Sequence, residues 1–329
     1  MNMAYRAILA ATFCFLSGQA ATAVNSADGQ LPKIVISGAN GYLGREATRL
    51  LLAQGVLPQN LILVTRSVDN LRNMSERGVS VRRGDFDDPT SLPAAFAGGT
   101  RLLLISTTES GPKLLQQNTA AIKAAGTVGI RYIVYTSMVN AKALANYVLA
   151  ANYATEQALA ASGIEWTAQR DQDYQDNLLD SGAVAIATGQ YVTNTGQGKA
   201  ASVSRDDCAA VAAALLLKPS HINRAIEVTG PELLSSDDVA ALLSEISGKP
   251  VRAVSIDDAM LGARLRNQHV PAELTQFLIG FGKARREGVF AVKTSIVKTI
   301  TGHEPMAMRD FVMAHRAQLL TAAVRRRPR

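Results

Sequence analysis

A glycine-rich turn between an apolar strand and a helix constrains the fold of this chain more than any other feature. Residues 34–36 are apolar, the turn that follows carries Gly38, Gly41 and Gly44, and residues 45–52 repeat apolar side chains at helical spacing. Such glycines allow a tight turn, let the backbone approach a pyrophosphate and let the helix pack closely on the strand. The helix N-terminus adds unpaired N–H donors and a favourable dipole. The turn therefore predicts a dinucleotide site with these contacts: Gly38, Asn40, Gly41, Tyr42, Leu43 and Gly44.

The surroundings of the turn strengthen this prediction. Three glycines alone are weak evidence, because loops collect glycine for many reasons. Here a second apolar run, residues 61–64, arrives at the distance that a βαβ unit needs. The alternative is a plain strand–turn–helix corner without a ligand, and the combined pattern favours the cofactor site.

The residues after the second predicted strand discriminate between cofactors. An acid there accepts hydrogen bonds from a ribose 2′-hydroxyl, whereas a cation pairs with a 2′-phosphate. Arg66 supplies a planar fork of donors and Ser67 adds a hydroxyl, which favours NADP(H) over NAD(H). The alternative for Arg66 is a solvated surface residue, and Asp69 leaves room for NAD(H).

Length and composition are those of an ordinary globular protein. The 329 residues are 47% hydrophobic and 19% charged, enough for a large core in one large or two unequal domains. The formal charge of +7 falls to +2 without Arg6 and the four arginines of the tail, residues 325–329. The sequence has neither a recognition-helix signature nor aromatic residues interleaved with basic ones, so we expect a solvated tail and no nucleic-acid partner.

The first 23 residues have the pattern of a targeting segment. A short start with Arg6, an apolar run at 7–16 and small residues at 21–23 are typical of a secretory signal peptide cleaved near Ala23. A run of this length is too short to span a bilayer, so we expect no membrane span. A wrongly assigned start codon or an inert extension is the alternative, with a cytoplasmic protein. Export conflicts with a cytosolic cofactor, because the segment lacks a twin-arginine pair.

Cysteine and histidine usage argues against disulfides and metals. Cys14 lies in the predicted leader and Cys208 would be alone in the mature chain, which leaves no intrachain disulfide and no thiolate site. The histidines are scattered without the spacing of metal ligands: His221, His269, His303 and His315. We therefore expect no metal.

Predicted strands and helices alternate from residue 32 to about residue 170. After the first two strands, further strands are predicted at 79–83, 101–106, 132–135 and 164–168, and further helices at 91–96, 113–125 and 152–162. Alternation of this kind predicts an α/β protein whose residues 32–170 form a doubly wound, mostly parallel Rossmann sheet.

Beyond about Arg170 the alternation becomes irregular. Ser204 caps a predicted helix at 208–217, and further elements are predicted at 226–228, 237–246, 271–281 and 308–320. We expect residues 171–324 to be interleaved with the core and to form a smaller, mainly helical lobe. This lobe would lie over the carboxyl ends of the strands, where open α/β sheets bind ligands.

Several segments together resemble one known family. They are the turn 38–44, Gly84-Asp85-Phe86, and the segments 104–108, 135–137, 155–156, 198–207, 301–303 and 310–311. Over residues 33–320 the chain resembles the NmrA-like branch of the atypical short-chain dehydrogenase/reductases, and more narrowly the bacterial NAD(P)H:quinone oxidoreductases of that branch. The resemblance implies that Asp85 and Phe86 contact adenine. It also implies that Ser106 and Thr107 line the path towards the nicotinamide.

The usual catalytic pair of short-chain dehydrogenases is incomplete in this chain. In their Tyr-x-x-x-Lys motif the two residues share a helix face, and the ammonium lowers the pKa of the phenol. Tyr153 has the right spacing, but Gln157 replaces the lysine. Tyr153 is therefore either a proton donor or a packed helix residue. Ser137 is the better candidate for hydrogen-bonding a substrate carbonyl, with the capping of a local turn as its alternative.

A quinone tolerates the loss of a strong general acid, because aromatisation stabilises the reduced product. We therefore predict hydride transfer from the nicotinamide to a quinone or similar carbonyl compound, with Ser137 and Tyr174 polarising a substrate oxygen. Packing between the lobes is the alternative role of Tyr174. Two other functions stay open: a non-enzymatic NAD(P)-binding redox sensor that regulates a partner protein, and a reductase or epimerase of sugar nucleotides or flavonoid-like compounds. Both a monomer and a homodimer fit the sequence.

Overall fold

The computed structural model of the protein describes residues 32–147 and 149–326. The predicted leader, residues 1–23, and the last three residues of the tail lie outside this part of the chain. Within the tail, Arg325 is the last residue of a helix and Arg326 forms an ion pair with Asp180 at 2.7 Å. No helix in the described ranges combines the length and apolar character needed to cross a bilayer.

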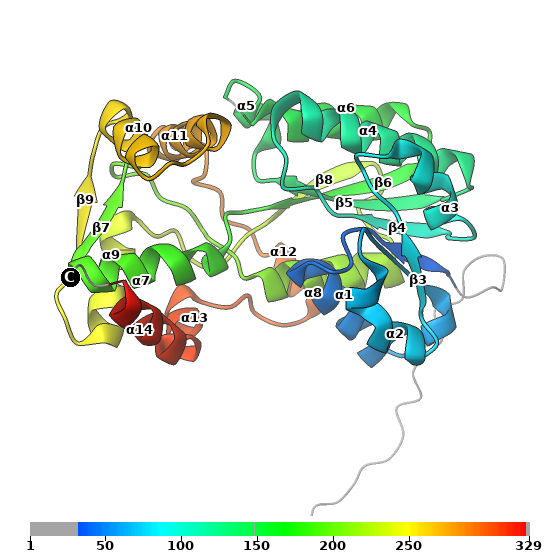
Figure 1. The fold of residues 1–329 in the computed structure, drawn as a ribbon, viewed down its shortest axis with the longest axis horizontal. Coiled ribbons are helices and arrows are strands. Elements are labelled where there is room, and N and C mark those ends of the chain that lie inside the picture. Colours follow the sequence, from blue (N-terminus) through cyan, green and yellow to red (C-terminus); the bar gives the residue numbers. More distant parts are fainter. Residues whose placement is uncertain (1–31, 148, 327–329) are drawn as a thin grey trace, which may run out of the picture.

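Seven parallel strands form the sheet of the larger body (Figure 1). Their order is β3-β2-β1-β4-β5-β6-β8, so the direction of winding reverses between β1 and β4. The predicted doubly wound parallel sheet is confirmed. The strands are β1 (Ile34–Ile36), β2 (Leu61–Thr65), β3 (Ser80–Arg83), β4 (Arg101–Leu104), β5 (Tyr132–Met138), β6 (Glu165–Asp171) and β8 (Arg224–Val228).

Helices cover both faces of this sheet, which explains why its central strands are continuous apolar runs. One face carries α1 (Tyr42–Ala53) and α8 (Arg205–Leu217), with α12 (Ile296–Thr301) beside α8. The other carries α3 (Leu92–Phe96), α4 (Gly111–Thr127) and α6 (Ala150–Ala161). The short helices are α2 (Arg72–Glu76) and α5 (Ala141–Leu144).

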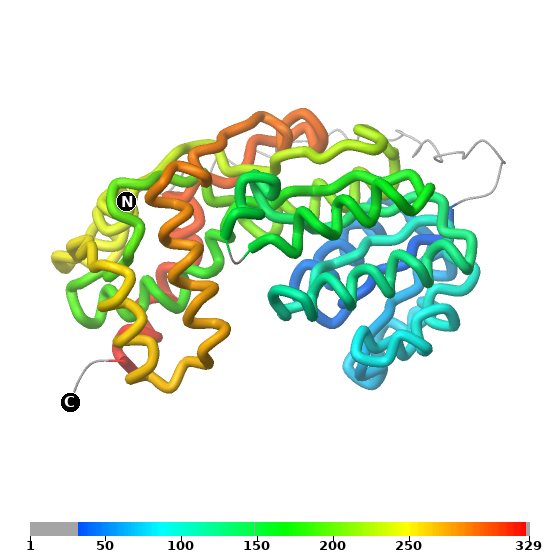
Figure 2. The backbone as a smooth tube through the Cα atoms, turned by 90° about the horizontal axis from the view of Figure 1, so that it is seen from above, coloured from blue at the N-terminus to red at the C-terminus, as the bar shows by residue number. Residues whose placement is uncertain are grey.

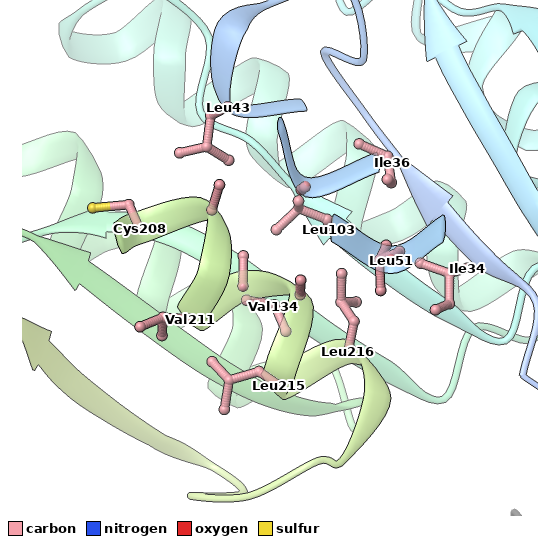
Figure 3. Packing of buried hydrophobic residues seen from close by; sticks show 14 of the residues in the cluster. Ile34, Ile36, Leu43, Leu51, Leu103, Val134, Cys208, Val211, Leu215 and Leu216 are labelled. Atoms are coloured by element: carbon pink, nitrogen blue, oxygen red, sulfur yellow. The ribbon is translucent and has the colours of Figure 1, made fainter. Parts of the chain in front are cut away.

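The core between the sheet and the α1–α8 face is tightly packed with aliphatic side chains. Strand residues alternate between the two faces, so Ile34 and Ile36 point to this core and Val35 to the opposite one. Figure 3 shows side chains of α8 meeting those of α1 and the central strands: Cys208, Val211, Leu215, Leu216, Leu43, Leu51, Ile34, Ile36, Leu103 and Val134. The C-terminal half of the chain therefore contributes α8, β8 and α12 to the dinucleotide-binding body.

The smaller lobe lies at one end of the sheet (Figures 1 and 2). Its helices are α7 (Leu178–Thr188), α9 (Ser236–Ser247), α10 (Asp258–Asn267), α11 (Ala272–Arg286), α13 (Met308–Ala314) and α14 (Arg316–Arg325). It also contains a parallel pair that the sequence did not reveal, β7 (Gln190–Thr193) with β9 (Arg252–Ser255). The helix predicted at 308–320 is two helices, because the first ends at Ala314.

The ends of two helices show how single residues fix them, and the first confirms the predicted cap at Ser204. The Ser204 hydroxyl accepts a hydrogen bond from the backbone N–H of Asp207 at 3.0 Å, which caps α8. Gly248 ends α9 with φ of +66°, a conformation that favours glycine.

The glycine turn yields a first prediction. A Cβ at Gly44 would lie 2.7 Å from the Gly38 carbonyl oxygen and 2.8 Å from the Ala39 Cα. Since both are backbone atoms, we expect Gly44→Ala to lower the free energy of unfolding in urea by about 1–3 kcal/mol.

Gly126→Ala in α4 is the matched control. Its new Cβ would meet the Ile164 side chain at an ordinary 3.8 Å. We expect it to leave the free energy of unfolding unchanged or to raise it by up to about 1 kcal/mol. Equal losses in the two variants would contradict the close approach at Gly44.

Candidate functional site

The carboxyl ends of the strands open into a cleft of about 910 Å³, a volume typical of small-molecule sites. Its walls come from the loops after the strands of the large sheet and from the beginning of α11. Of the residues predicted to bind cofactor or substrate, all but Tyr153 line it: Gly38, Asn40, Gly41, Tyr42, Leu43, Gly44, Arg66, Asp85, Phe86, Ser106, Thr107, Ser137 and Tyr174.

The glycine turn forms one wall as a cradle for an anion. Gly38 has φ of +59°, and its carbonyl oxygen accepts a hydrogen bond from the N–H of Gly41 at 2.9 Å. Helix α1 starts at Tyr42 with a glycine as its cap, so no side chain fills the space in front of it, and its first turn holds no acidic residue. Because the first N–H groups of a helix lack intrahelical partners, this end of the cleft fits a pyrophosphate.

The other side chains of the turn fix its surroundings. The Asn40 amide oxygen accepts a hydrogen bond from Arg45 at 2.5 Å. The Tyr42 hydroxyl donates to Asp206 at 2.7 Å, and this bond to a carboxylate raises the pKa of Tyr42. Tyr42 thus joins the turn to the start of α8 at the edge of the cleft.

Arg66 stands at the end of the cleft where a cofactor's adenosine part would lie next to the turn. Its side chain is exposed and lines the cleft together with Ser67 and Asp87. The pKa of Asp87 is lowered first by a hydrogen bond from Gln117, then by Lys113, with a smaller effect of Arg66. Asp85 both lines the cleft and accepts a hydrogen bond from the N–H of Asp87 at 3.1 Å. It therefore also shapes its own turn.

The loop after β4 carries the hydroxyls predicted to lie on the way to the nicotinamide. The Ser106 hydroxyl lies 2.9 Å from the Thr136 carbonyl oxygen and 3.1 Å from the Tyr135 hydroxyl. The Thr107 hydroxyl donates to Gln117 at 2.6 Å, and Gln117 in turn donates to Asp87 at 2.9 Å. These bonds hold the loop in place between the two ends of the cleft.

Ser137, at the end of β5, is tied to a buried ion pair. Its hydroxyl donates to Glu156 of α6 at 2.6 Å. Arg170 holds the same carboxylate through two hydrogen bonds of 2.9 and 2.6 Å, which raise the pKa of Arg170 further. In this geometry Ser137 offers the cleft a lone pair, and donation to a substrate oxygen requires its hydroxyl to turn away from Glu156. Glu156 is only 3% exposed. It belongs to one of the segments that carry the family resemblance, but the sequence did not predict its burial or its ion pair.

Tyr153 is placed apart from the other predicted site residues. It lies half-buried on α6 outside the residues that line the cleft, and Gln157 is exposed on the same helix. Helix α6 lines the cleft with Ala151 and Asn152, and the Asn152 amide donates to the Tyr135 hydroxyl at 3.3 Å. The proposed proton donation by Tyr153 thus has no support from the geometry of the cleft.

Tyr174 contacts a buried acid, Asp171, that the sequence did not single out. Its hydroxyl donates to Asp171 at 3.0 Å, and the other carboxylate oxygen accepts a hydrogen bond from Gln169 at 2.8 Å. Burial raises the pKa of Asp171 to about 6, although these hydrogen bonds act in the opposite direction. The guanidinium of Arg205 lies 4.6 Å from the centre of the Tyr174 ring. An acid at a strand end has the pattern of a turn residue, so no sequence pattern marked Asp171 as a site residue.

The lobe closes the remaining side of the cleft with apolar side chains. Leu274 and Phe277 of α11 line it together with Met138 and Leu149. The sequence placed a lobe over the strand ends but did not identify these residues. Leu274 is 47% exposed, so the cleft has apolar surface available for a ligand.

Comparisons with known proteins agree with this geometry. A family model described as NAD(P)H-binding matches residues 38–219. The chain is 29% identical to quinone oxidoreductase 2 of Escherichia coli, over 85% of this chain and 97% of that protein. It is 30% identical to an NAD(P)H azoreductase of Xenophilus azovorans, over 86% of this chain and 98% of the relative.

Solved structures share the fold over nearly their whole length. The NADPH-dependent quinone oxidoreductase of Escherichia coli complexed with NADPH has a TM-score of 0.81 at 29% identity, covering 85% of this chain and 99% of that chain. A triphenylmethane reductase of Citrobacter sp. complexed with NADP(H) has a TM-score of 0.78 at 28% identity, covering 86% and 99%.

The buried acid yields a prediction on stability. Because the pKa of Asp171 is higher in the folded protein than in the unfolded chain, the folded state loses stability relative to the unfolded state as the pH rises through about 6. Asp171→Asn removes this loss. We expect the free energy of unfolding of the variant, minus that of the parent, to increase by about 1 kcal/mol from pH 5 to pH 8. Urea unfolding at both pH values measures this difference. A difference that stays constant with pH would contradict the raised pKa.

Proposed function

This chain belongs to the NAD(P)H-binding, NmrA-like family, and we propose that it is an NADPH-dependent reductase of quinones or similar carbonyl compounds. The observation that carries the proposal is one continuous cleft with an anion cradle at one side and apolar lobe residues at the other. Such a cleft suits a dinucleotide and an aromatic acceptor side by side.

Each part of the cleft has a distinct role in this proposal. The N-terminal turn of α1 binds the pyrophosphate, and Arg66 with Ser67 binds the 2′-phosphate. Asp85 and Phe86 contact the adenine, while Ser106 and Thr107 face the path of the nicotinamide. When bound, the cofactor supplies a hydride to the substrate.

The substrate lies between the strand ends and α11. Met138, Leu149, Leu274 and Phe277 offer apolar surface to a flat ring and exclude water from it. A quinone suits this site because its reduction needs orientation more than a strong acid. The names of the relatives, which include a quinone oxidoreductase and an azoreductase, support an acceptor of this class.

A non-enzymatic redox sensor is the second candidate. The observation that favours it is the lack of the usual Tyr–Lys pair, since Gln157 stands where the lysine is expected and Tyr153 lies outside the cleft. A sensor binds the cofactor tightly without turning it over and interacts with a partner protein in one cofactor state only.

Turnover separates the two candidates. We expect purified protein to oxidise NADPH, followed by its absorbance, when benzoquinones and naphthoquinones are added, and to do so at a rate proportional to protein concentration. Azo and triphenylmethane dyes belong in the same panel. Tight NADPH binding without oxidation by any acceptor would contradict the reductase and favour the sensor.

The choice of cofactor is tested at Arg66. Removing a charge-assisted hydrogen bond to a phosphate costs about 1.5–3 kcal/mol, or roughly 10- to 100-fold in affinity. We therefore expect Arg66→Ala to weaken binding of NADPH by this factor and to leave binding of NADH nearly unchanged, as measured by titration calorimetry.

Arg72→Ala is the matched control, because it removes the same charge from the neighbouring surface. Arg72 lies 3.7 Å from Asp69 in an exposed ion pair, so its loss should change neither affinity. Equal weakening of NADPH and NADH in Arg66→Ala would overturn the role given to Arg66.

A further inference from the structure

A buried carboxyl lies directly behind a tyrosine that lines the cleft. Asp171 is 4% exposed and sits at the end of β6, between Met138 of β5 and Val228 of β8. The Tyr174 hydroxyl lies 3.0 Å from this carboxyl, and Tyr174 also forms part of the cleft wall. Tyr174 therefore links the buried Asp171 to the space where a substrate would bind.

Burial favours the protonated form of Asp171 and outweighs the hydrogen bonds to its carboxyl, which act in the opposite direction. Its hydrogen-bond partners are Gln169, Tyr174 and the Cys208 thiol of α8, none of which carries a charge in its ordinary state. Burial also raises the pKa of Cys208 and of Tyr174 well above their usual values, so both keep their protons.

Charged groups near this cluster shift the pKa values of Tyr174 and Cys208. Arg205 of α8 faces the Tyr174 ring and opposes the rise of its pKa. Asp176 and Asp207 raise the pKa of Cys208 further. A carboxyl in this setting takes up a proton near neutrality, which a solvated aspartate does not.

The other two hydroxyls predicted to act on the substrate, those of Ser137 and Tyr153, are poorer proton sources. The hydroxyl hydrogen of Ser137 is directed to Glu156, whose other carboxylate oxygen lies 2.6 Å from Arg170 in an ion pair. Tyr153 lies outside the residues that line the cleft. The reduced substrate nevertheless needs a proton on its oxygen.

We propose that Asp171 stores this proton and that Tyr174 passes it to the substrate, an inference that rests on the proposed reductase function. The substrate gains two electrons with the hydride that the dihydronicotinamide loses and is thereby reduced. The O–H bond of Tyr174 breaks as the substrate oxygen is protonated. The O–H bond of Asp171 then breaks as the Tyr174 oxygen is reprotonated, and one proton from water restores the carboxyl between turnovers.

The proton on Asp171 also determines where the phenol hydrogen points. A protonated Asp171 donates to the Tyr174 oxygen and leaves the phenol hydrogen free for the substrate. An ionised Asp171 accepts that hydrogen and holds it away from the substrate. The pair is therefore active with a neutral carboxyl and inactive with a carboxylate, and the rate should fall with rising pH.

Single-turnover oxidation of bound NADPH by a quinone tests the relay. We expect the parent rate to fall at least about tenfold between about pH 5.5 and pH 7.5, since a general acid of this kind contributes about a hundredfold or more. Asp171→Asn and Tyr174→Phe should be slow at both pH values and independent of pH. Asp237→Asn, which removes an exposed carboxylate of α9, should keep the parent profile.

Two readouts do not depend on turnover. NADPH affinity should be the same within about twofold in the parent and Asp171→Asn, because the amide keeps the shape of the carboxyl. Carbon-13 NMR of the aspartate carboxyls in the cofactor-free protein should show one signal that titrates near pH 6. That signal should be absent in Asp171→Asn and present in Asp237→Asn.

The outcomes that overturn the relay are distinct from failure of the proposed function. A parent rate independent of pH, a parent-like slope in Asp171→Asn, or the absence of the titrating carboxyl signal overturns the relay while turnover persists. If the parent protein fails to oxidise NADPH with any quinone tested, the proposed function and the relay are both overturned.

Discussion

The close approach between the glycine turn and the first helix is the contact on which the rest of the site depends. Without a Cβ at Gly44, the start of α1 packs against the Gly38 carbonyl, and the N–H groups of the helix face the cleft. Because β1 is central in the sheet, this end of the helix lies at the reversal of winding between β1 and β4. The crevice that parallel sheets offer at such a point becomes an anion site.

Side chains alternate between the two faces of the sheet along β5 and β6. Two different groups of polar side chains therefore lie at the same edge of the sheet. Ser137 and Arg170 face α6 and join Glu156 in a neutralised ion pair, whereas Asp171 faces α8 and has uncharged partners. The first arrangement fixes a hydroxyl in one orientation. The second gives a carboxyl that exchanges a proton near neutrality. Ser137 and Tyr174, which carry these two arrangements to the surface, both line the same cleft. In our proposal one strand end therefore positions a substrate and the next supplies it with a proton.

The sequence predicted what depends on local pattern and not what depends on distant contacts. Apolar runs, the glycine turn and the cap at Ser204 were enough to predict the sheet and its helices. The pair β7–β9 was missed because its strands are short, partly polar and far apart in the chain. The burial of Asp171 and the position of Phe277 in the cleft wall also depend on contacts between segments that are far apart in the sequence. The incomplete Tyr–Lys pair was visible in the sequence, but the placement of Tyr153 away from the cleft was not.

A crystal structure of the protein with NADP⁺ tests the central claim most directly, namely that one cleft holds the cofactor along its cradle and leaves the nicotinamide beside Ser106 and Thr107. We expect the pyrophosphate on the N–H groups of the first turn of α1, the 2′-phosphate within hydrogen-bond distance of Arg66 and the nicotinamide beside Ser106 and Thr107. A 2′-phosphate that points away from Arg66, or a nicotinamide outside contact with Ser106 and Thr107, would contradict this claim.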